Sequence, residues 1–104
     1  ALVEDVGHPT IRLQLDTGIA ALLGEDFSAL VAAYAPLVGH VHVSEPALAT
    51  VGEGTTDHAA CAAALRAHLP SLFPTLEMLA EPGADATVEI ERALRCARRH
   101  YGGG

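Results

Sequence analysis

The sequence has no lysine and no tryptophan, and aromatic residues make up only 4% of its 104 residues. Its six basic residues are all arginines and face thirteen carboxylates. The net charge of -7 therefore argues against a nucleic-acid backbone as the main partner. Half of the residues are hydrophobic, so a core must be built from Ala, Leu and Val. The composition suits one small domain with a light aliphatic core.

Cysteines are few, and long apolar runs are missing. Cys61 and Cys96 lack the paired spacing of a zinc knuckle or a redox dithiol, so both are expected to be buried free thiols. No stretch is apolar enough to span a bilayer and no secretory signal is visible, which predicts a cytoplasmic protein without a membrane partner. The chain begins with Ala1 and not with Met, so we expect the start of a longer polypeptide to be absent.

Hydrophobic periodicity predicts three strands, each followed by a helix. The segments with the alternation of half-buried strands are 11–16, 37–44 and 73–79. The expected helices cover residues 27–34, 57–68 and 85–100. Thr56 or Asp57 caps the second helix and Asp85 caps the third. Strand and helix in strict alternation predict an α/β fold with a parallel sheet and right-handed crossovers.

The segments between these elements are expected to be turns and loops. Residues 1–9 have the pattern of the tail of a helix, and residues 16–18 that of a turn. A loop from Glu45 to Thr56 follows the second strand. Loops of this length in compact domains are commonly functional.

One face of the expected sheet is polar near its carboxyl end. Because side chains alternate along a strand, His40 and His42 share the face opposite Val41. The same alternation places Asp16 and Glu77 on the polar face of the first and third strands. Buried parallel strands normally read as continuous apolar runs. The polar strand ends therefore indicate the wall of a barrel active site.

Asp16, His42 and Glu77 form a donor set of two carboxylates and one imidazole, which suits Mn²⁺, Mg²⁺, Co²⁺ or Zn²⁺. A divalent ion would let both carboxylates stay ionised side by side. Each residue alone has another explanation: Asp16 in a turn, His42 in the core, Glu77 paired with an arginine. Their positions at three matching strand ends favour a metal site.

Four motifs occur in the order and spacing of a known family: Leu15-Asp16-Thr17-Gly18, Gly39-His40-Val41-His42, Gly52-Glu53-Gly54 and Thr75-Leu76-Glu77-Met78. The pattern resembles the C-terminal part of the xylose isomerase-like TIM barrels, the sugar phosphate isomerase/epimerase and type-2 AP endonuclease superfamily. The resemblance implies that residues 1–101 form the sixth to eighth strand-helix units of a (β/α)8 barrel, followed by a glycine tail over 102–104.

The resemblance also implies a site and a reaction. Asp16, His42 and Glu77 would match three of four metal ligands, and the fourth, a glutamate, would lie before Ala1. The family moves a proton next to a carbonyl of a small sugar, sugar phosphate or polyol, with paired glutamates as acid and base. Glu77 would be the catalytic member of that pair in this chain. His40 and Glu53 are the expected substrate-side residues. The alternatives are that His40, one layer below His42, packs there and orients its neighbours, and that Gly52-Glu53-Gly54 is only a turn.

Two positions depart from the family pattern. Ile19 stands where many relatives carry a histidine that contacts substrate, and the loop after Glu45 offers Pro46, Ala47 and Leu48 instead of an arginine. Either the substrate is smaller or less polar than a typical ketose, or the site has lost its original chemistry. A dehydratase would use the same metal face, whereas the acidic balance disfavours a DNA-cleaving enzyme.

The alternative of a different class is a truncated, non-catalytic barrel that acts through a partner or an oligomer, because three strands leave two open edges. The remaining histidines are expected to be solvated; they are His8, His58, His68 and His100. The arginines near the C-terminus are interpreted as favourable charges in the last turns of a helix, not as a binding patch.

Overall fold

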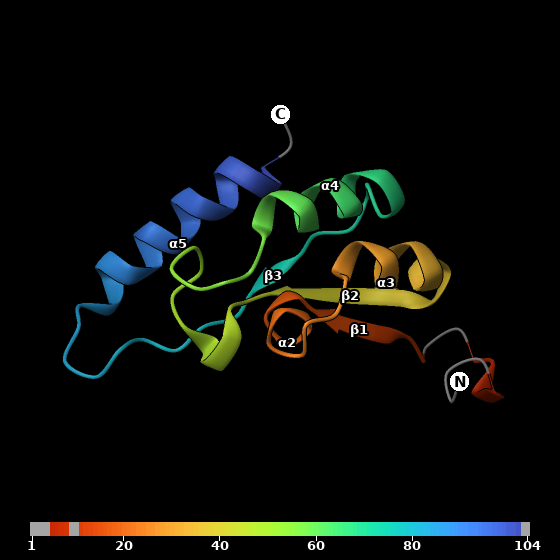
Figure 1. The fold of residues 1–104 in the computed structure, drawn as a ribbon, viewed down its shortest axis with the longest axis horizontal. Coiled ribbons are helices and arrows are strands. Elements are labelled where there is room, and N and C mark those ends of the chain that lie inside the picture. Colours follow the sequence, from red (N-terminus) through yellow and green to blue (C-terminus); the bar gives the residue numbers. More distant parts are fainter. Residues whose placement is uncertain (1–4, 9–10, 103–104) are drawn as a thin grey trace.

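The computed structural model describes residues 5–8 and 11–102. Its parallel sheet has the order β1-β2-β3, with β1 (Leu13–Asp16), β2 (Val38–Val43) and β3 (Thr75–Leu76). The helices are α2 (Thr17–Leu22), α3 (Phe27–Tyr34), α4 (His58–His68) and α5 (Ala86–Tyr101), with short 3-10 helices η1 (Ala35–Leu37) and η2 (Pro46–Leu48) (Figure 1). The predicted strand-helix alternation and the parallel sheet are confirmed.

An aspartate is the N-cap residue of each of the four α-helices α2 to α5. Asp16, Asp26, Asp57 and Asp85 each accept a hydrogen bond from a backbone N–H in the first turn of the helix that follows. The expected caps Asp57 and Asp85 are therefore confirmed. The expectation of a simple turn over 16–18 is wrong, because Asp16 caps α2 and this short helix continues directly from the strand.

Two apolar clusters hold the helices against the sheet. Val41 and Val43 are fully buried, as the alternation on β2 predicts. One cluster joins Val41 to α3 and α4, which lie side by side in Figure 1. The other joins Val43 to Val51 in the following loop and to Ala93 of α5. The polar strand face is therefore left for the other side of the sheet.

The outer strands are shorter than predicted. β3 has two residues where seven were expected over 73–79, because Pro74 lacks a backbone N–H and Phe73 is 90% exposed. Glu77 still donates its backbone N–H to the Val43 carbonyl at 3.0 Å, so it stays beside β2. β1 begins at Leu13, and Ile11 before it is exposed.

Some sequence predictions fall outside the described residues. The initial helix expected over 1–9 lies mostly there, as do Gly103 and Gly104 of the expected glycine tail. Within the described ranges, every helix is too short or too polar to cross a bilayer. The cytoplasmic location stays a prediction.

Candidate metal centre

Asp16, His42 and Glu77 come together at the carboxyl ends of the three strands. One ligand atom from each lies within 4.8 Å of the others. The sheet register explains the meeting, because Asp16 pairs with His42 across β1 and β2, and His42 pairs with Thr75 across β2 and β3. The prediction that these side chains would share one edge of the sheet agrees with this geometry; their role remains to be tested.

His42 and Glu77 are in direct contact. His42 Nδ1 lies 2.7 Å from Glu77 Oε2 and 3.3 Å from Gln14 Nε2. The two side chains are 19% and 41% exposed, so His42 is not a core histidine. The partner of Glu77 among the described residues is this imidazole and not an arginine. Both groups remain within reach of solvent and of a ligand.

Asp16 is held by a buried serine that the sequence analysis did not identify. Ser44 Oγ donates to Asp16 Oδ1 at 2.6 Å, and the Ile19 N–H donates to the same oxygen at 2.9 Å. Ser44 is itself fixed, because its backbone N–H donates to Thr17 Oγ1 and that hydroxyl donates to the Ser44 carbonyl. The carboxylate is thereby oriented through one oxygen. Its other oxygen receives no hydrogen bond from the described part of the chain.

The approach of α2 to this serine requires a glycine. A Cβ on Gly18 would lie 2.6 Å from the backbone of Glu45 and from Ser44 Oγ. The Gly18 N–H instead donates to Ser44 Oγ at 3.0 Å. The Asp-Thr-Gly sequence therefore packs the first turn of α2 against the end of β2. A serine directly after a strand of alternating valines was the available signal for this arrangement.

The donor set fits a divalent cation. Two carboxylates and one imidazole are ligands that Mn²⁺, Mg²⁺, Co²⁺ and Zn²⁺ accept, and the three groups already converge. The half-exposed position of all three leaves room for further ligands from water or substrate. A candidate Asp-His-Glu metal site is therefore present.

A cavity of about 210 Å³ adjoins this site. Asp16 and Glu77 line it together with a mostly apolar wall of Ile19, Leu22, Pro46, Ala47 and Leu48. In that wall, Ala47 and Leu48 have φ angles of 58° and 55°, which are unfavourable for residues with a Cβ. A backbone hydrogen bond of 2.9 Å from Leu79 to Leu48 holds this strained turn. The cavity wall is thus fixed and largely apolar.

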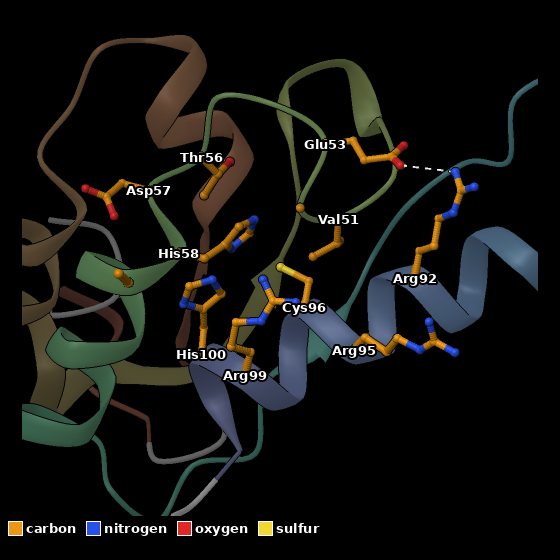
Figure 2. A pocket seen from close by; sticks show the side chains of 12 residues that line it. Val51, Glu53, Thr56, Asp57, His58, Arg92, Arg95, Cys96, Arg99 and His100 are labelled. Atoms are coloured by element: carbon orange, nitrogen blue, oxygen red, sulfur yellow. Dashed lines mark hydrogen bonds and ion pairs between the residues drawn. The ribbon is translucent and has the colours of Figure 1, made fainter.

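His40 and Glu53 lie in different surroundings. The ring of His40 packs edge-on against that of His42 at a centroid distance of 4.8 Å. Glu53 pairs with Arg92 at 3.4 Å and lines a separate cavity between the loop after β2 and α5 (Figure 2). The structure therefore brings His40, but not Glu53, next to the candidate metal ligands.

A second imidazole–carboxylate pair is buried behind the site. Glu45 Oε2 lies 2.7 Å from His58 Nε2, and His58 Nδ1 lies 2.7 Å from the Tyr101 hydroxyl. The expectation that His58 is solvated is wrong, since its side chain is 5% exposed and that of Glu45 is 0% exposed. Glu45 also accepts the backbone N–H groups of Gly52 and Thr56. We call Glu45, His58 and Tyr101 the buried cluster.

The cysteines and Tyr101 also lie in this region. Burial raises the pKa of the Cys61 thiol to about 12, and burial raises that of the Tyr101 hydroxyl above its usual range. Cys61 is a buried free thiol, as predicted, whereas Cys96 is only partly buried. Both cysteines are therefore protonated at neutral pH and serve in packing.

Comparisons with solved structures match nearly the whole chain. A crystal structure of D-psicose 3-epimerase in the presence of D-fructose has a TM-score of 0.83 over 97% of this chain, at 24% identity. D-psicose 3-epimerase with D-tagatose from Clostridium cellulolyticum H10 gives 0.81 over 97%, at 18% identity. A structure of L-ribulose 3-epimerase gives 0.67 over 86%, at 28% identity. No protein-family model and no curated protein matches the chain.

The chain spans less than half of each of these proteins. It covers 42% of each of the two D-psicose 3-epimerase chains and 30% of the L-ribulose 3-epimerase chain. Together with the parallel order of the strands, these matches confirm the predicted fold class, a partial TIM barrel of three consecutive strand-helix units. The resemblance to xylose isomerase-like sugar epimerases is confirmed at the level of the fold.

Proposed function

We propose that this chain forms the metal-binding part of a divalent-metal-dependent isomerase or epimerase of a small sugar, sugar phosphate or polyol. The observation that carries the proposal is the convergence of Asp16, His42 and Glu77 within 4.8 Å at the ends of three adjacent parallel strands. Two of the epimerase structures whose fold it shares were determined with D-fructose or D-tagatose, which supports a ketose-like substrate.

The proposed chemistry is proton transfer at a carbon next to a carbonyl. A bound divalent ion, held by Asp16, His42 and Glu77, would supply polarisation of the substrate oxygens. Glu77 would take or return the proton at the carbon, because its carboxylate is exposed to the cavity. His42, in contact with Glu77 Oε2, would fix the direction of that carboxylate. The second acid-base group would come from the rest of a barrel.

The wall of the adjoining cavity indicates which substrates fit. Ile19 and Leu48 line this cavity and offer no side chain that could form a hydrogen bond with the hydroxyls of a sugar. We therefore propose a substrate that is small, or poor in hydroxyls on this side. His40 would act through its contact with His42, and Glu53 would reach a ligand only by leaving Arg92.

Metal content tests the proposal directly. Purified chain is incubated with Mn²⁺, Mg²⁺, Co²⁺ or Zn²⁺, dialysed and analysed for elements. Wild type should retain about one ion per chain for at least one metal, whereas Glu77→Gln and His42→Ala should lose it. Glu53→Gln is the matched control, because this carboxylate lies outside the site. Wild type without a stoichiometric ion contradicts the proposal.

Two other functions remain open to test. A non-catalytic role through a partner or oligomer is favoured by the edges of the sheet, because β1 and β3 each pair with one neighbour in the described part of the chain. Light scattering addresses it: a stable, folded monomer would contradict a need for further strands.

A dehydratase on the same metal face would release water from the substrate, and the mass of the product distinguishes it from an epimerase.

A further inference from the structure

Three of the six arginines line a cavity that the proposed sugar site does not use. This cavity, of about 490 Å³, lies between α5 and the segment from Val51 to Ala59 (Figure 2). Arg92, Arg95 and Arg99 reach it from α5, at the three- and four-residue spacing that places side chains on one face of a helix. The interpretation of these arginines as favourable helix-end charges alone is therefore incomplete.

The arginines are not all engaged. Arg92 pairs with Glu53 at 3.4 Å, but Arg95 and Arg99 have no hydrogen bond or ion pair with any described residue. Figure 2 shows Arg99 folded toward Cys96 and His58, whereas Arg95 extends away on the side of Arg92. A free guanidinium thus faces the inner end of the cavity in a chain whose net charge is -7.

The nearby carboxylates are already occupied. Glu45 is fully buried and accepts three hydrogen bonds, from Gly52, Thr56 and His58. Asp57 caps α4 through the Ala60 N–H, and Glu53 is the partner of Arg92. Arg95 and Arg99 are therefore the charged side chains of this cavity that have neither a hydrogen bond nor an ion pair with a described residue.

The inner end of the cavity also has a fixed wall. His58 has both ring nitrogens engaged, by Glu45 and by Tyr101, so it cannot turn toward a ligand. His100 lies beside it at a ring-centroid distance of 6.1 Å, and its ring makes no hydrogen bond within the described ranges. Even a neutral imidazole can donate one N–H. Arg99 and His100 are thus two available donors at one end of the cavity.

We propose that this cavity binds a phosphate group, with Arg99 as the principal ligand and His100 as a second donor. A guanidinium presents paired N–H donors that match two oxygens of an oxyanion. The cavity is open and large enough for either free phosphate or the phosphate of a small ester. The same loop carries Glu45 and Leu48 beside the candidate metal centre, so an occupied phosphate site would brace the wall of the sugar cavity.

Calorimetric titration of the full chain with inorganic phosphate tests the proposal. The protein is first freed of metal by chelation and dialysis, so that phosphate cannot bind through an ion and the result is independent of the proposed function. Sodium chloride at matched ionic strength corrects for screening. Wild type should bind phosphate saturably. Arg99→Gln should weaken binding by about tenfold or more, the loss expected for one charge-assisted hydrogen bond.

The matched control is Arg98→Gln. It removes the same charge from the adjacent position of α5, but Arg98 lies outside this cavity. It should change the affinity by less than about twofold, since a single exposed charge contributes little. Equal losses in the two variants, or absence of saturable binding to wild type, would overturn the proposal.

Further arms identify the source of the phosphate. Fructose 6-phosphate binding as tightly as inorganic phosphate, or more tightly, supports an ester site, and binding of inorganic phosphate alone supports a free-phosphate site. If fructose binds as tightly as fructose 6-phosphate, the proposal is overturned.

If Arg99→Gln does not fold, the amide chemical shifts of wild type test the proposal instead. Phosphate should move those of residues 51–59 and 92–100, and shifts confined to the neighbourhood of Asp16 would contradict the site.

Discussion

Two imidazole–carboxylate pairs in this chain have the same 2.7 Å contact and opposite surroundings. The side chains of His42 and Glu77, at the carboxyl end of the sheet, are 19% and 41% exposed. Besides their mutual contact, His42 has a side-chain hydrogen bond with Gln14. His58 and Glu45, in the buried cluster, are almost completely enclosed, and Tyr101, Gly52 and Thr56 satisfy their remaining atoms. Contact distance therefore does not distinguish the two pairs; exposure and the number of remaining partners do.

The largest test of this contrast removes one carboxylate from each pair. Glu45→Leu should lower the free energy of unfolding by about 3 to 5 kcal/mol, because it leaves the buried donors of Thr56 and His58, and the partly buried Gly52 N–H, without an acceptor. Glu77→Leu should cost less than about 1 kcal/mol, because its partner stays in contact with water. Urea unfolding at pH 7 measures both. Equal losses would erase the distinction between the two pairs.

Protonation of Glu45 in acid should destabilise the fold less than Glu45→Leu does. The reason is that a protonated carboxyl can still accept a hydrogen bond. Burial alone would raise the pKa of Glu45, but the hydrogen bonds from His58, Thr56 and Gly52 outweigh it and set that pKa below its ordinary value of 4.5. Such a group stabilises fully above its unfolded pKa, and this stabilisation is lost as the pH falls through the folded pKa. The free energy of unfolding should therefore fall more steeply below pH 4.5 in wild type than in Glu45→Leu. Urea unfolding of both proteins between pH 6 and about pH 3 measures this. If the free energies of unfolding of wild type and Glu45→Leu fall in parallel over that range, the prediction is wrong.

The smallest effect is expected at Thr50, in the loop after β2. Its hydroxyl is buried and has no hydrogen-bond partner among the described residues. Thr50→Val removes that unsatisfied hydroxyl at nearly constant shape, so stability should stay within about 1 kcal/mol of wild type. Thr56→Val is the control, because the Thr56 hydroxyl donates to the Ser44 carbonyl at 2.9 Å and its loss should cost about 1 to 3 kcal/mol. Equal thermal unfolding of the two variants would contradict the assignment.

The sheet and its polar edge were predictable because they depend on local alternation and on strand order. His42 follows His40 by two residues, and a parallel sheet brings the ends of neighbouring strands together whatever the loops do. The caps at Asp57 and Asp85 were predictable for the same local reason. The meeting of side chains at the strand ends survives small errors in the strand boundaries, and the short β3 is an example.

The buried cluster could not be predicted, because its members meet only through tertiary packing. Glu45 and His58 are 13 residues apart, and His58 and Tyr101 are 43 residues apart. A histidine at the first position of a helix has the same local pattern whether it faces water or the interior. The arginine cavity was missed for a similar reason, because helix periodicity places Arg99 on a face but does not say what lies opposite.

The long separation between His58 and Tyr101 also orders events during translation. At about 5 to 20 residues per second, roughly 2 to 9 seconds pass between synthesis of His58 and of Tyr101. Before Tyr101 is added, the chain lacks the hydroxyl that covers the second ring nitrogen of His58. Docking of the last turn of α5 therefore completes the hydrogen bonds of the His58 ring, and a released chain that ends before residue 101 would lack this contact.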